Sequence, residues 1–105
     1  MANDTFKALA HPLRRDIVER LSGGMATVGE VSRDFHVAKP TISRHLKMLE
    51  DAGVVNRVID GRTHRLALRP EALAEASGWI DSQRIRWERL FDVVGTYLEE
   101  QEERS

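Results

Sequence analysis

Apolar positions in the first part of the chain recur at helical spacing. Phe6 and Leu9 form the apolar edge of a predicted helix over residues 4–10. Pro12 opens a second predicted helix, because proline suits the first helical position, and Ser22-Gly23-Gly24 ends it. We therefore expect two short helices before the first pair of glycines.

A close pair of helices is predicted next. Thr27 followed by Glu30 is a capping box, in which each side chain satisfies a backbone N–H at a helix start, and this helix ends at Phe35. After a tight turn, Lys39-Pro40-Thr41 opens another helix, which ends at Ala52-Gly53. Its buried stripe consists of Ile42, Leu46 and Leu49. Two helices joined in this way are typical of a helix-turn-helix.

The hydrophobic period then changes from 3.6 to 2. The runs 54–59 and 63–68 are rich in β-formers and are joined around Asp60-Gly61, which predicts a β-hairpin. Pro70 begins a last helix that is predicted to reach Glu102, with Gly78 as a candidate position for a break. The expected fold is mainly α with a small hairpin, in the order α-α-α-α-β-β-α of a winged helix-turn-helix.

The last helix carries more apolar surface than one small domain can cover. A helix over residues 70–102 extends about 50 Å, whereas a globule of this chain length has a radius of gyration of about 13 Å. A second copy of the chain is therefore expected to cover the stripe. The alternative for Trp79 and Trp87 is a ligand-binding box. The predicted dimer interface consists of Phe6, Leu9, Trp79, Ile80, Trp87, Leu90, Phe91, Val94, Tyr97 and Leu98.

Composition limits the classes of protein that the chain fits. Its 105 residues suit one domain, 1–105, with 70–102 as the dimerisation helix. There is no cysteine, which excludes disulfides and thiolate metal sites. No apolar run approaches about 18 residues and the N-terminus does not resemble a signal peptide, so we expect no membrane contact and a cytoplasmic location.

Charge is divided unevenly along the chain. The formal net charge is −1, but residues 1–70 hold 12 Lys and Arg against 8 Asp and Glu, while residues 71–105 hold 4 against 9. Such asymmetry favours two faces with different roles, one of which suits a polyanion. A solvated acidic tail without a partner is the alternative.

The basic residues concentrate where a winged helix-turn-helix contacts double-stranded DNA. The N-terminal part of the second helix of the motif enters the major groove, and the hairpin lies against the backbone or the minor groove. We expect Arg44 to make a bidentate contact to guanine. The predicted DNA-binding residues are Thr27, Lys39, Pro40, Thr41, Ser43, Arg44, His45, Lys47, Arg57, Arg62, His64 and Arg65.

The four histidines also have structural interpretations. His36 occupies the turn, where a positive φ is often required, and histidine is among the residue types enriched there. His11 suits a helix cap, His45 suits packing or a DNA contact, and His64 suits solvent or phosphate contact. No two histidines stand three or four residues apart, so no zinc pair is predicted. Arg14 and Arg15 form either a solvated face or, through one of them, a phosphate contact.

Three stretches resemble the ArsR/SmtB family of bacterial repressors. These are the segment 6–15, the string Thr41-Ile42-Ser43-Arg44-His45-Leu46-Lys47-Met48-Leu49, and Ala52-Gly53-Val54-Val55; the likeness continues through 60–62 and 87–90. The resemblance implies homodimers joined by the first and last helices, two-fold-symmetric operators and repression of transcription. The metal-sensing members use cysteines before the turn, or His and carboxylates on the last helix. This chain lacks both those cysteines and a histidine on the last helix, which indicates the branch without a metal site. No cofactor is predicted, and the sequence does not identify a small-molecule inducer.

A protein-interaction module and an enzyme are the two alternatives to a DNA-binding repressor. A winged-helix protein-interaction module would use the apolar last helix to dock a different protein. An enzyme is not expected, because the chain has no glycine-rich phosphate loop and no nucleophile–base arrangement; Ser43 and His45 are two residues apart on a helix and point to different sides.

Overall fold

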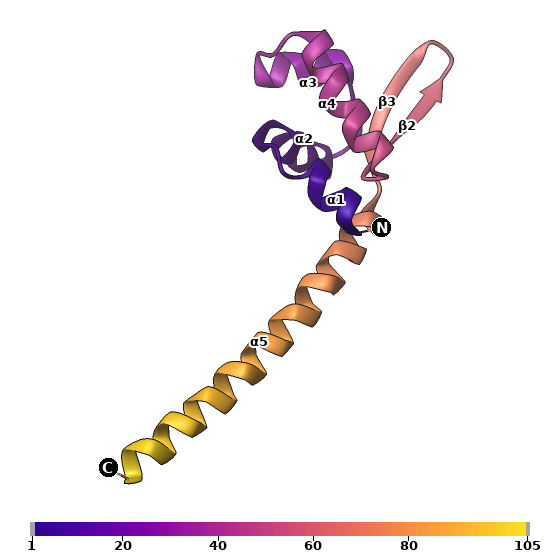
Figure 1. Ribbon diagram of the computed structural model, residues 1–105. Helices are drawn as coiled ribbons and strands as arrows, with labels where there is room; N and C mark the ends of the chain where they lie inside the picture. The colour runs from indigo at the N-terminus through magenta and orange to yellow at the C-terminus, as the bar shows by residue number, and fades with distance from the viewer. Residues whose placement is uncertain (1, 105) are drawn as a thin grey trace.

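The computed structural model describes residues 2–104 and confirms a winged helix-turn-helix (Figure 1). Eight elements follow one another along the chain: α1 (Ala2–Ala8), α2 (Pro12–Ser22), β1 (Ala26–Thr27), α3 (Val28–Phe35), α4 (Lys39–Asp51), β2 (Val55–Asp60), β3 (Thr63–Leu68) and α5 (Pro70–Arg104). The first helix lies two residues earlier than the predicted 4–10. His11 has extended backbone angles, so the chain leaves the helix before the His11-Pro12 step.

The three strands form an antiparallel sheet in the order β1-β3-β2. The hairpin was predicted correctly: Asp60 pairs with Thr63, and Gly61 has φ 62° in the two-residue turn between them, a conformation that glycine adopts without steric cost. Strand β1 was not predicted, because two residues are too few to show an alternating pattern. It pairs Ala26 with Leu66 and so attaches the start of α3 to the wing.

A small core holds the helices and the sheet together. Ile42, Leu46 and Leu49 on α4 are fully buried, as the predicted stripe required. The rest of this core comes from each of the other elements before α5, namely Ala8, Ile17, Leu21, Ala26, Val31, Val54, Val55 and Leu66. The buried side of α4 therefore fixes how the helix is oriented, and its polar face lies on the opposite side.

Helix α5 projects from this core as an arm (Figure 1). It passes through Gly78 without a break and continues to Arg104. Of its residues only Ala76 is buried. The molecule measures 74 × 25 × 21 Å and has a radius of gyration of 20.4 Å, well above the roughly 13 Å of a compact chain of this length. Within residues 2–104, no helix has both the length and the apolar character that crossing a membrane requires.

Candidate nucleic-acid interface

The first helix of the helix-turn-helix starts at the predicted cap. The backbone N–H of Glu30 donates to Thr27 Oγ1 at 3.2 Å, and the Thr27 hydroxyl lies 3.2 Å from Glu30 Oε1. This differs in one bond from the expected box, because the Glu30 carboxylate contacts the Thr27 hydroxyl rather than its backbone N–H. Thr27 is half-buried and its hydroxyl has partners within the chain, so its structural role is established independently of DNA.

The turn between α3 and α4 depends on His36. Its φ of 54° and ψ of 41° lie in the left-handed region, and no other non-glycine residue in the described range 2–104 has a positive φ. The prediction that His36 serves backbone geometry is thus confirmed. The Ser32 hydroxyl donates to the Val37 carbonyl across the same turn. These contacts set the direction in which α4 leaves the turn.

The N-terminal part of α4 presents polar and cationic side chains that are free of partners. Lys39, Ser43 and Arg44 are exposed, Thr41 is half-exposed, and none of them forms a side-chain hydrogen bond or ion pair within residues 2–104. The first turn has no acidic residue, and Ala38 provides no side-chain cap. The positive end of the helix and its two nearest cations therefore face solvent together. Lys47, further along, pairs loosely with Asp51 at 3.7 Å on the surface.

The wing divides its basic residues between two roles. Arg62 and Arg65 are exposed and have no ion-pair partner among the described residues. Arg57, in contrast, places its guanidinium 2.7 Å from Glu50 on α4 and 3.3 Å from the His64 ring. The expectation of a simple DNA contact for Arg57 missed this bond. Glu50 was not singled out, and no pattern along the chain reveals a pair that forms only when β2 lies beside α4.

A second group of histidine and arginine side chains lies where α2 meets α4. His11 caps α2, as predicted, by accepting the Leu13 N–H on Nδ1 at 3.1 Å. Its ring lies 4.5 Å from the ring of His45, centroid to centroid, so the His45 ring packs against a residue of its own chain. Burial lowers the pKa of His45, and the positive charges of His11, Arg14 and Arg44 lower it further.

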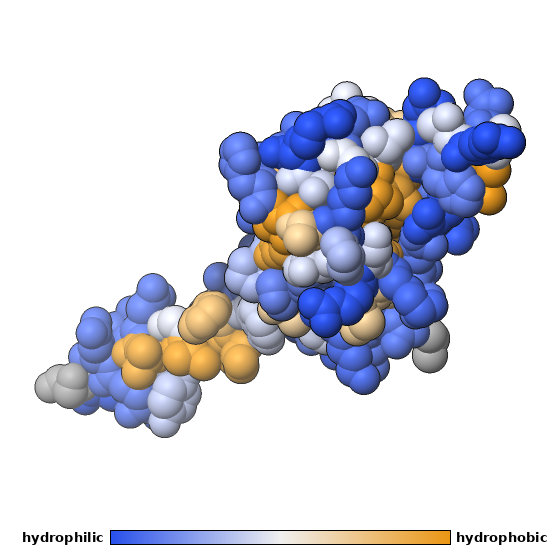
Figure 2. All heavy atoms as spheres, turned by 90° about the horizontal axis from the view of Figure 1, so that it is seen from above, coloured by the Kyte–Doolittle hydropathy of each residue, from blue (hydrophilic) through white to orange (hydrophobic). Residues whose placement is uncertain are grey.

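The residues of the predicted dimer interface lie on two kinds of surface. Leu9 is partly buried against the core of its own chain, and Phe6 contacts Trp79 edge-on with ring centroids 5.5 Å apart. The remaining residues are exposed along α5, with Trp87 at 60% and Phe91 at 74%. Figure 2 shows apolar side chains in a row along the projecting arm, flanked by hydrophilic ones.

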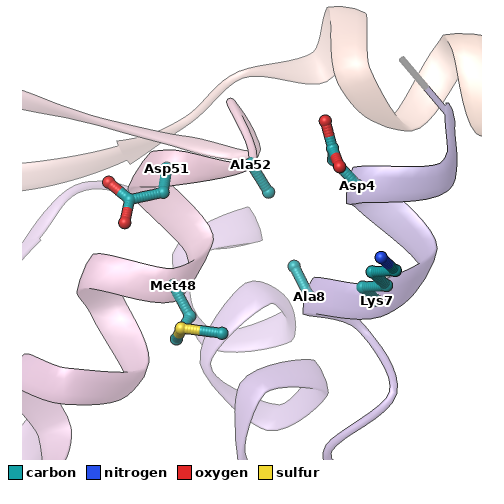
Figure 3. A pocket seen from close by; sticks show the side chains of 6 residues that line it. All are labelled: Asp4, Lys7, Ala8, Met48, Asp51 and Ala52. Atoms are coloured by element: carbon teal, nitrogen blue, oxygen red, sulfur yellow. The ribbon is translucent and has the colours of Figure 1, made fainter.

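A hollow of about 290 Å³ lies between α1 and the end of α4 (Figure 3). It is lined by Asp4, Lys7, Ala8, Met48, Asp51 and Ala52. The alanine methyls point into it, whereas the Asp51 carboxylate turns away (Figure 3). Within residues 2–104, no three side chains of the metal-binding types gather closely enough to hold an ion.

Comparison with known proteins places this architecture in a family. Residues 11–57 match the model of the family described as bacterial regulatory protein, arsR family. The chain is 35% identical over 78 residues to the transcriptional repressor SdpR of Bacillus subtilis (strain 168), which covers 74% of this chain and 87% of SdpR.

Solved structures agree with this match. The ArsR family transcriptional regulator RHA00566 superposes with a TM-score of 0.75 at 37% identity, over 82% of this chain and 94% of that one. The homodimeric winged helix-turn-helix domain of Mb0332 from Mycobacterium bovis shares the fold, with a TM-score of 0.64 at 22% identity over 84% of this chain and 80% of that one. Similarity over nearly the whole of SdpR and RHA00566 establishes the relationship. The chain belongs to the ArsR family, a non-enzymatic class of DNA-binding transcriptional regulators.

Proposed function

We propose that the chain is a transcriptional repressor that acts as a homodimer on a two-fold-symmetric operator in the cytoplasm. One observation carries the proposal: Lys39, Arg44, Arg62 and Arg65 are exposed on α4 and the wing without an ion-pair partner within residues 2–104. Unpaired cations on a helix that fits the major groove, and on the hairpin beside it, suit the two kinds of contact that DNA recognition needs.

The two sets of contacts have different tasks in this proposal. Arg44, with Thr41 and Ser43 beside it, reads base edges from the N-terminal part of α4. Arg62, Arg65 and His64 contact backbone phosphates from the wing. Lys39, Pro40 and Lys47 lie on the same helix and add to its contact with the groove, whereas Arg57 orients the wing through Glu50.

The homodimer is supported by the unpartnered face of α5. The exposed aromatic and aliphatic residues of its outer half exceed what a monomer usually leaves in water. The Mb0332 domain, which has the same fold, is homodimeric. Residues 70–102 serve as the dimerisation helix of a single-domain protein, and a two-fold dimer requires a two-fold operator. No cofactor is included in the proposal.

DNA selection followed by fluorescence anisotropy tests the proposed function. The preferred duplex is selected from a random pool, and dissociation constants are then compared with those for a scrambled duplex of equal length. Arg44→Ala is expected to weaken the selected duplex by about 1–3 kcal/mol and to relax the preference for it. Arg62→Ala is expected to weaken both duplexes about equally and to flatten the salt dependence.

Arg89→Ala is the matched control, because Arg89 is exposed on α5 on the face away from the apolar stripe. It is expected to bind both duplexes like the unmodified protein. Selection that yields no preferred duplex, or an Arg44→Ala variant with unchanged affinity and preference, contradicts the proposal.

The same apolar arm favours one second candidate, a module that docks a different protein through α5. A stable monomer at micromolar concentration, together with equally weak binding of selected and scrambled DNA, would favour this candidate over the repressor.

A further inference from the structure

Three basic side chains lie where the start of α2 meets α4: His11, Arg14 and His45, which we name the His–Arg cluster. His11 and Arg14 belong to the start of α2, and His45 to the middle of α4. The centroids of the two imidazole rings lie 4.5 Å apart, and the angle between the ring planes is 49°. Arg14 is close enough for its charge to act on His45. The packing of α2 against α4 thus brings together three basic groups from distant parts of the sequence.

The cluster has no anion of its own. Within the described range 2–104, none of its members forms an ion pair, and Arg14 Nε is buried without a hydrogen-bond partner. The first turn of α2 contains no acidic residue. The carboxylates on neighbouring elements have other positions or partners. Glu50 pairs with Arg57. Asp4 and Asp51 line the hollow one turn further along α4, together with Lys7. Basic groups gathered without a counter-charge favour an external anion.

The donors in the cluster suit a phosphate group. Because His11 Nδ1 accepts the Leu13 N–H, the proton of the neutral His11 ring is on Nε2, which remains available as a donor. The Arg14 guanidinium supplies charge-assisted donors, and the positive end of α2 lies at the same place. Arg15 is different, since its Nη1 donates to the Leu9 carbonyl at 2.8 Å.

The position of the cluster identifies the source of the phosphate. His45 follows Arg44 on α4, about 100° further around the helix, and the Arg44 charge acts on it; Arg44 is the residue to which the proposed function gives a base contact. Phosphates line both sides of the major groove, so a group beside the recognition helix meets the backbone. We propose that the His–Arg cluster binds a DNA backbone phosphate at the flank of the groove that α4 occupies. This inference rests on the proposed function and adds to it a contact that α4 shares with the start of α2, a helix outside the helix-turn-helix and the wing.

A bound phosphate reverses the electrostatics of His45. In the free protein, burial lowers the pKa of His45, and the neighbouring basic groups His11, Arg14 and Arg44 lower it further. An adjacent phosphate favours the protonated ring and raises that pKa. DNA binding therefore takes up a proton, and affinity rises as pH falls through the range between the bound and free pKa values. The rise is at most about tenfold per unit of pKa difference.

Anisotropy with a labelled duplex of about three helical turns tests this contact. Any fixed sequence serves, because a phosphate contact is independent of sequence. Dissociation constants are measured over a salt series at pH about 6 and about 8, on either side of the range where histidine titrates. Arg14→Gln is expected to reduce the slope of log affinity against log salt by about 1 per bound protomer. His45→Gln is expected to reduce the rise in affinity at the lower pH.

Arg15→Gln is the matched control from the same turn of α2, and its salt slope is expected to equal that of the unmodified protein. Arg14→Lys keeps the charge and is expected to restore the slope. Thermal unfolding of each variant separates a lost contact from a lost fold.

The inference is overturned if Arg14→Gln keeps the full salt slope and His45→Gln keeps the full pH dependence, while Arg44→Ala still loses preference for the selected duplex. In that case the proposed function stands. An unmodified protein that binds no duplex at any salt concentration overturns both. Inorganic phosphate that shifts the NMR signals of the His11 and His45 rings, with DNA slopes unchanged in Arg14→Gln, indicates a site for free anions instead.

Discussion

Arg57 and Arg62 lie five positions apart on one hairpin and have the same side chain, yet they differ in what is left for a ligand. The Arg57 guanidinium is held by Glu50 and His64, whereas Arg62 at the turn has no ion-pair partner among residues 2–104. A basic residue in a wing is thus a candidate for DNA contact only after its internal partners are known. The same distinction separates Arg14 from Arg15 on α2.

His45 gives a prediction for stability against pH. Its pKa in the folded chain is lowered below the ordinary value of 6.5, so protonation opposes folding. At pH values above 6.5, His45 leaves the free energy of unfolding unchanged. As the pH falls below 6.5, the free energy of unfolding decreases. His45→Gln removes this loss. Urea unfolding at pH about 7.5 and about 5 is expected to show a smaller decrease for His45→Gln than for the unmodified protein.

Equal decreases in His45→Gln and in the unmodified protein would refute the assignment to His45.

Between residue and fold, the helix-turn-helix is positioned by features at the ends of its helices. Thr27 fixes the start of α3, His36 ends that helix in the left-handed region, and Ser32 closes the turn onto Val37. Each feature satisfies backbone groups that a helix end leaves without partners. The polar face of α4 therefore depends on residues that are not on α4.

Thr27→Ala tests the first of these features. Loss of the hydroxyl leaves the Glu30 N–H without its acceptor, and the free energy of unfolding is expected to fall by about 1 kcal/mol. Thr27→Ser keeps the hydroxyl and is expected to retain most of the stability. Urea unfolding measures both variants; equal losses in the two would assign the effect to the Thr27 methyl group rather than to the cap.

The elements differ in how far the sequence determines them. The helices from Pro12 to Asp51, the hairpin and the Thr27 cap follow from local periods and turn chemistry, and the structure confirms them. Strand β1 and the Arg57–Glu50 pair depend on contacts between distant segments, which no local pattern records. Helix α1 ends two residues before the predicted limit, in a turn closed by the hydrogen bond from the Ala10 N–H to the Lys7 carbonyl.

For the whole molecule, the proposed homodimer makes the arm formed by α5 the interface between the two copies. Trp87→Glu places a charge in the middle of the apolar stripe, and sedimentation velocity is expected to show monomers where the unmodified protein sediments as a dimer. The reason is that burying an unpaired carboxylate in an apolar interface is strongly unfavourable.

Ser82→Glu adds the same charge to α5 on the side away from Trp87, and it is expected to remain dimeric. A Trp87→Glu protein that sediments as a dimer would contradict the role given to the stripe.

The length of the uncovered arm also has a consequence for how the protein responds to its own abundance. If two copies cover each other's apolar arms, the dimer is the complete form of the protein. At low concentration, the amount of dimer rises with the square of the chain concentration, and the apparent stability of the dimer rises with that concentration too. A cell that halves its supply of this chain then loses more than half of the complete form. In the proposed homodimer, gene dosage and dilution during growth therefore change the amount of the complete form directly.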